Sequence, residues 1–97
     1  MEIESWKDMP PFIEIWNLII AHAGDNFYTK TGLEFTYEVN GNIFYPSRTD
    51  YKVLKGDFER AYTLVPLDGP GRINKIVRGP AYVWAVLHDQ RVSNGMW

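Results

Sequence analysis

The segment GPAYVWAVLH, residues 79–88, constrains the fold more than any other part of the chain. A Gly-Pro pair is typical of a helix start, because proline at the first helical position has a preset φ angle. Every residue between this pair and His88 is hydrophobic, so the predicted helix has no polar face. A helix that is apolar all round is buried. We therefore expect it inside the core or at a subunit interface, with Val83 and Trp84 hidden from water.

The chain is long enough to bury such a helix without covalent cross-links. Its 97 residues match the commonest domain size, and 45% hydrophobic with 23% charged residues is an ordinary globular composition. We expect one domain over residues 1–97. Cysteine is absent, which excludes disulfides and favours a cytoplasmic location. The N-terminal stretch is acidic where a signal peptide is basic, and the longest apolar run, residues 15–21, is too short to cross a membrane.

A second helix is predicted in the stretch DMPPFIEIWNLIIAHAG, residues 8–24. Pro11 supplies a first turn, Asp8 is available as a cap, and Gly24 ends the pattern. The main apolar stripe follows a 3.6-residue spacing and contains Phe12, Ile13, Trp16, Ile19, Ile20 and Ala23. Ile15 and Leu18 fall beside this stripe and widen it. A wide arc indicates burial against more than one surface, either inside the domain or across a dimer.

The most specific local signal predicts a β-hairpin over residues 33–48. Apolar and polar residues alternate in its first half, which is the pattern of a strand with one solvated face. Asn40-Gly41 is a preferred pair for a two-residue type I′ turn. Such a turn pairs Tyr37 with Phe44, whereas a bulged three-residue loop pairs Tyr37 with Tyr45. We favour the two-residue turn.

The return strand leads into a further strand and a helix. Pro46 lacks an N–H group near the end of the return strand, which predicts an edge position in the sheet. Residues 51–54 alternate again and offer a third short strand. A helix is expected from about Lys55, with Asp57 in a first turn that favours negative charge, and Pro66 ends it.

The next segment predicts another short helix, from Gly69-Pro70 to Val77. Together with the apolar last helix it resembles a helix-turn-helix in outline. The second helix of that motif needs polar side chains to read bases, and the apolar segment has almost none before His88, so the simple motif is excluded. We expect an α+β fold: an N-terminal helix, an antiparallel β-hairpin and three short C-terminal helices packed on one sheet face, like a winged helix.

Charge is distributed unevenly along the chain, although the net charge is only −2. Residues 1–40 carry seven acidic and two basic side chains, a balance of −5, and residues 41–97 carry eight basic and five acidic ones, a balance of +3. We therefore hypothesise a non-enzymatic module that contacts duplex DNA through the short basic helix, with the hairpin tip as a wing. The candidate residues are Arg72, Asn74, Lys75, Arg78, Arg48, Lys52 and Lys55. An ordinary solvated helix face is the competing interpretation.

The alternative function is a homodimer or protein-partner module without a nucleic-acid role. Excess apolar surface favours it, and the candidate interface residues are Ile15, Leu18, Trp84 and Trp97. An enzyme is a third option that needs a histidine in a pocket. His22 and His88 each lie near the end of a predicted helix and have an aspartate nearby, but the chain contains no nucleophile or metal-ligand motif. We expect no cofactor and no metal.

Overall fold

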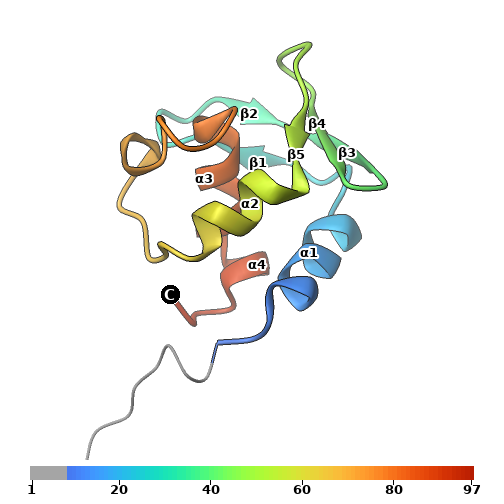
Figure 1. Cartoon of the computed structure of the whole chain (residues 1–97). Coiled ribbons are helices and arrows are strands. Elements are labelled where there is room, and N and C mark those ends of the chain that lie inside the picture. The colour runs from blue at the N-terminus through green and yellow to red at the C-terminus, as the bar shows by residue number, and fades with distance from the viewer. Residues whose placement is uncertain (1–8) are drawn as a thin grey trace, which may run out of the picture.

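The computed structural model describes residues 9–97 and has two antiparallel sheets with helices packed around them (Figure 1). The predicted α+β class is confirmed. The described elements are α1 (Phe12–Ala21), β1 (Phe27–Tyr28), β2 (Glu34–Phe35), β3 (Tyr37–Asn40), β4 (Ile43–Pro46), β5 (Val53–Leu54), α2 (Lys55–Tyr62), the 3₁₀ turn η2 (Pro70–Arg72), α3 (Pro80–His88) and α4 (Gln90–Ser93). The winged-helix likeness stays a prediction.

The apolar helix α3 occupies the centre of the molecule, as predicted (Figure 1). Five consecutive residues, 83–87, are buried, and Val83 and Trp84 are 0% and 7% exposed. Burial of consecutive residues requires neighbours on every side of a helix. The indole N–H of Trp84 donates to the carbonyl oxygen of Leu67 at 2.9 Å, which satisfies the one polar group that this side chain takes into the core.

Helix α1 turns a different face to the core than its main apolar stripe predicts. Its buried residues are Ile15, Trp16 and Ile19, whereas Ile13 and Ile20 are 51% and 43% exposed. The apolar arc of this helix is wide, and its contacts with α2 and α4 select one part of that arc for burial. The helix follows Pro11, which makes no side-chain cap, and the predicted cap residue Asp8 lies outside the described residues.

Strands β3 and β4 form the predicted hairpin, but its turn lies one residue later along the chain. Asn40 pairs with Ile43, so the central turn residues are Gly41 and Asn42. Of these two, only Gly41 has a positive φ angle, which is typical of a type II′ turn rather than type I′. The predicted pairing of Tyr37 with Phe44 is therefore wrong.

The error in register does not change which side chains point to the core. Tyr37 pairs with Pro46, two residues further along than predicted, and a shift of two residues preserves the faces of a strand. Tyr37 and Phe44 are therefore diagonal neighbours on the inner face, where their rings stack 4.4 Å apart. The hydroxyl of Tyr37 donates to the carbonyl oxygen of Ile19 in α1, which joins the sheet to the first helix.

Strand β4 is the central strand of its sheet, so the predicted edge position is wrong. The strand order is β3-β4-β5, and β5 confirms the third short strand. Pro46 is tolerated because β5 pairs only with Ile43 and Phe44, so the missing N–H falls beyond the short ladder. The prediction that the first hairpin strand begins at Leu33 is also wrong, because Glu34 and Phe35 form β2 and pair with β1 in a second, two-stranded sheet that was not predicted.

Helix α2 begins where the sequence predicts, but it ends at Tyr62, three residues earlier than the predicted end at Val65. A carboxylate oxygen of Asp57 accepts the backbone N–H of Leu54 at 3.0 Å and so caps the first turn. Phe58 and Ala61 are fully buried and pack toward α1 and α3.

The predicted basic helix over residues 69–77 is wrong. Only the single 3₁₀ turn η2 forms there, and turns and bends continue to Gly79. Ile73 and Val77 are buried and hold this segment against the core, and the backbone leaves helical geometry at Ile73, whose φ and ψ are −124° and 6°. Gly71 and Asn74 are weak helix formers, so tertiary anchoring decides the local conformation.

The C-terminal helix α4 closes the core against the first sheet. Val92 is 1% exposed, and the guanidinium carbon of Arg91 lies 3.8 Å from the ring centroid of Phe27 in β1. The same guanidinium donates to the carbonyl oxygen of Asn26 at 2.7 Å and to the carboxylate of Asp89. The hydrogen bond with Arg91 holds the pKa of Asp89 below its usual range. Segments 65 residues apart in the sequence therefore meet in one packed contact.

Candidate functional site

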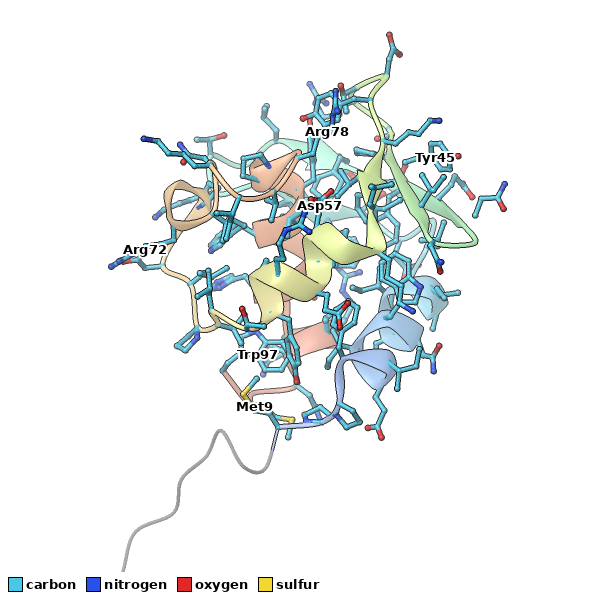
Figure 2. All side chains as sticks on the ribbon, in the orientation of Figure 1. Met9, Tyr45, Asp57, Arg72, Arg78 and Trp97 are labelled. Atoms are coloured by element: carbon cyan, nitrogen blue, oxygen red, sulfur yellow. The ribbon has the colours of Figure 1, made fainter. Side chains whose placement is uncertain are left out.

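The predicted DNA-binding residues do not form one surface in the structure. Arg72 and Arg78 lie on separate parts of the molecule (Figure 2). Arg72 has a local partner, because its Nε atom is 3.2 Å from a carboxylate oxygen of Asp68. Their hydrogen bond lowers the pKa of Asp68 and raises the pKa of Arg72. The neighbouring carboxylate weakens the field that Arg72 presents to an anion.

Arg78 instead lies beside the short strand β5. Its guanidinium carbon is 5.4 Å from the ring centroid of Tyr51, which is within the range of a cation–π contact. A cleft of about 500 Å³ opens here, which we call the β5 cleft. It is lined by Asp50, Tyr51, Lys52, Leu54, Asp57 and Arg78. Two predicted DNA-binding residues, Lys52 and Arg78, therefore meet at one site although they are far apart in the sequence.

The charge of the β5 cleft depends on which of its carboxylates already have partners. Asp57 is buried, caps α2 and forms an ion pair with Arg60, so its charge is compensated inside the protein. Asp50 is exposed and lines the cleft together with the two cations. The two basic side chains, Lys52 and Arg78, and the one uncompensated acidic side chain, Asp50, give a net charge of +1. The β5 cleft is therefore a weakly cationic site.

The other predicted DNA-binding residues lie outside the β5 cleft. Arg48 is exposed and donates to the carbonyl oxygen of Glu34 at 3.2 Å. Lys55 is half-buried at the start of α2, and Asn74 and Lys75 are exposed in the irregular segment after η2. The hypothesis of one basic helix face therefore has no counterpart in the fold.

Lys30 was not among the predicted site residues, but it contributes to a second cleft. Lys30 lies in the acidic half of the chain, and its ammonium donates to the carbonyl oxygen of Asp68 at 2.6 Å. Lys30 and Arg72 line a cleft of about 460 Å³ at the Gly69-Pro70 turn. Only a tertiary contact between distant segments brings them together, so no local pattern indicates this site.

The residues predicted for a partner interface are buried in the folded chain or pack against its core. Ile15 and Trp84 are 1% and 7% exposed, so the chain itself already covers both side chains and neither is available to a partner. Leu18 is half-buried and packs against the core. Trp97 is half-buried too, and its indole N–H donates to the carbonyl oxygen of Leu87 at 2.9 Å. The exposed apolar side chains lie elsewhere, among them Ile13, Tyr28, Leu33 and Leu54.

The two histidines have structural partners rather than a shared pocket. His22 Nδ1 is 2.9 Å from a carboxylate oxygen of Asp25 on the surface, and the ring of His88 stacks on Trp84 at 4.4 Å. Neither histidine lines either of the two clefts described above. Among residues 9–97, no group of three or more His, Asp or Glu side chains is arranged to hold a metal ion. Within the same residues, every helix is too short or too polar to cross a membrane.

Comparisons with known proteins do not assign the chain to a family. No family model, no curated protein and no solved structure matches it.

Proposed function

We propose that this chain is a non-enzymatic binding module that contacts the phosphate backbone of duplex DNA through the β5 cleft. The observation that carries the proposal is the meeting of Lys52 and Arg78 at one site beside the ring of Tyr51. Arginine and lysine supply most phosphate contacts in protein–DNA complexes, and these contacts give affinity without sequence readout. A chain without cysteine suits a reducing compartment, so we place this activity in the cytoplasm.

The two cations of the cleft, Lys52 and Arg78, determine how strongly we expect the chain to bind DNA. Each neutralised phosphate contributes about −0.9 to the slope of log affinity against log salt, so two contacts give a slope of about −1.8. The exposed carboxylate of Asp50 reduces the attraction. The expected binding is therefore weak, salt-sensitive and independent of sequence.

Fluorescence anisotropy with duplex DNA at several salt concentrations tests this proposal. Arg78→Ala should weaken binding and reduce the slope to about −0.9, because one of two phosphate contacts is lost. Arg72→Ala and Lys75→Ala are matched controls outside the cleft and should leave the slope unchanged. Salt-independent binding, no binding, or equal effects of Arg72→Ala and Arg78→Ala would remove the β5 cleft as the contact site.

A second candidate function is a homo-oligomeric or protein-partner module. The specific observation in its favour is the number of large apolar side chains left exposed by the folded chain, including Leu54 at 53%. Light scattering over a range of protein concentrations separates the candidates. A strict monomer that binds DNA supports the first, and a dimer without affinity for DNA supports the second.

A further inference from the structure

The three-stranded sheet has one face that packs on the core and one face that does not. Tyr37, Phe44 and Val53 point inward and are buried, so the residues next to them in each strand point outward. Figure 2 shows Tyr45 of β4 on the side of the sheet away from Asp57 of α2. We call this side the outer face, and its residues are Glu38, Asn40, Ile43, Tyr45, Lys52 and Leu54.

The strand register arranges the outer face in two rows across the sheet. Glu38 pairs with Tyr45, and Lys52 lies opposite Tyr45 one step beyond the last paired residues of β4 and β5. The second row is Asn40, Ile43 and Leu54, which are paired directly. The first row therefore runs from an acid, through an aromatic ring, to a base.

The middle of the outer face is apolar and is only partly covered by residues 9–97. Ile43 and Tyr45 are half-buried and Leu54 is 53% exposed. None of the three belongs to the core or to the side chains packed against it in the described part of the chain. An antiparallel sheet can face water on one side, but that side normally carries polar residues.

We infer that the outer face binds the outer face of a second copy of this chain, around a two-fold axis parallel to β4. Such an axis keeps the position along the strand and exchanges the two edges of the sheet. It therefore places Glu38 of each copy opposite Lys52 of the other, with the two Tyr45 rings near the axis. The same surface meets itself, as a two-fold interface requires. Paired sheets of this kind pack about 10 Å apart with nearly aligned strands.

The charges on the outer face favour a second copy of this chain over other binding partners. The opposite charges of Glu38 and Lys52 stand on the two edges, separated by two strand spacings, which is roughly 10 Å. DNA would favour bases on both edges, and an acidic or basic protein would leave one edge repelled. The inference goes beyond the proposed DNA contact and does not depend on it. Lys52 and Leu54 of the outer face also line the β5 cleft. When Lys52 pairs with Glu38 of a second copy, Arg78 is the main cation of the cleft, and the salt slope expected for the dimer is about −0.9 instead of about −1.8.

A charge swap tests the inference on the full chain by sedimentation equilibrium. Glu38→Lys and Lys52→Glu each replace two attractive pairs by two repulsive ones, so each should raise the dimer dissociation constant on the order of 10-fold or more. The double variant restores both pairs and should return the constant to within about threefold of the parent. Glu59→Lys on α2 makes the same charge change away from the outer face and should have no effect.

Substitution at the axis gives an independent test. Tyr45→Arg brings two like charges together and should yield a monomer, while Tyr28→Arg, at a 56% exposed tyrosine of the other sheet, should leave the dimer intact. Circular dichroism of each variant verifies the fold, since all of the changed residues lie at the surface or are half-buried. A monomeric parent would overturn the inference, and so would a dimer that Tyr45→Arg leaves intact or that the double swap fails to restore. Glu38→Lys leaves the β5 cleft unchanged, so loss of the dimer and loss of DNA binding are read separately.

Discussion

The hydrogen bond from Trp84 to Leu67 makes a quantitative prediction, because the chain contains a matched second case. The indole N–H groups of Trp84 and Trp97 each donate to a backbone carbonyl at 2.9 Å. The first bond is buried in the core and the second is half-buried near the surface. Phenylalanine at either position removes the indole N–H group and part of the ring. At position 97 a water molecule can replace the lost N–H group, whereas at position 84 the surroundings are buried.

The expected cost differs between the two sites. In Trp84→Phe the carbonyl of Leu67 stays buried without a donor, which costs about 1–3 kcal/mol. The smaller ring loses roughly a further 1 kcal/mol of apolar burial, so the total is about 2–4 kcal/mol. In Trp97→Phe the net loss is about 1 kcal/mol, because the indole is only half-buried and a water molecule can take the place of its N–H group. For a domain of this size, the larger loss lowers the melting temperature by roughly 10–30 °C.

Urea unfolding followed by far-ultraviolet circular dichroism measures both values, and avoids tryptophan fluorescence, which the substitutions change. We expect the transition midpoint of Trp84→Phe to fall at least twice as far as that of Trp97→Phe, with equal slopes. Equal midpoints for the two variants would refute the reasoning, since burial of the bond would then have no measurable consequence.

Two further predictions concern backbone conformation and pH. Gly79→Ala should destabilise the protein by about 1–3 kcal/mol, because φ is +62° and a Cβ atom would lie 3.0 Å from Cγ2 of Val53; Gly71→Ala, with open space, should change stability by about 0.5 kcal/mol or less. Burial raises the pKa of Tyr37 well above its ordinary value of 10.0, so the folded state holds this proton more tightly than the unfolded state. Stability from this group is complete below about pH 10 and is lost as pH rises, so thermal unfolding should show a fall above pH 10 that Tyr37→Phe reduces.

Sequence patterns correctly predicted the elements that are buried on all sides, such as α3, or on one face only, such as the hairpin. The apolar segment 80–88 has no alternative to the core, and the alternation around Tyr37 fixes which face of the hairpin is buried. Helix α1 was harder, because Ile13, Ile15 and Ile20 together cover a wide arc and only the docked neighbours choose among them.

Patterns failed where tertiary contacts outweigh local preference. The turn of the hairpin uses Gly41 as its first central residue, and the sequence Asn-Gly-Asn allows both placements. Residues 73–79 are held by two buried anchors, Ile73 and Val77, which favour turns over the helix that a Gly-Pro start predicts. Strand β1 contains two residues, too few for a periodic signal.

The candidate site was predictable only in its residue types. Lys52 and Arg78 could be named as phosphate contacts from their charge, but their meeting at β5 depends on the path of the irregular segment between η2 and α3. The ion pair between Asp68 and Arg72 is local, because the two residues are only four positions apart in the sequence. The outer face follows from the register, which the sequence left open.

The contact between Arg91 and β1 has a consequence for synthesis of the chain on the ribosome. The carbonyl of Asn26 accepts a hydrogen bond from a guanidinium 65 residues further along, and the same guanidinium covers one side of the Phe27 ring. Non-local closure of this kind delays folding until both segments have been synthesised. Chains that stop before Arg91 should therefore be open to proteases, whereas chains that extend to Trp97 should resist them.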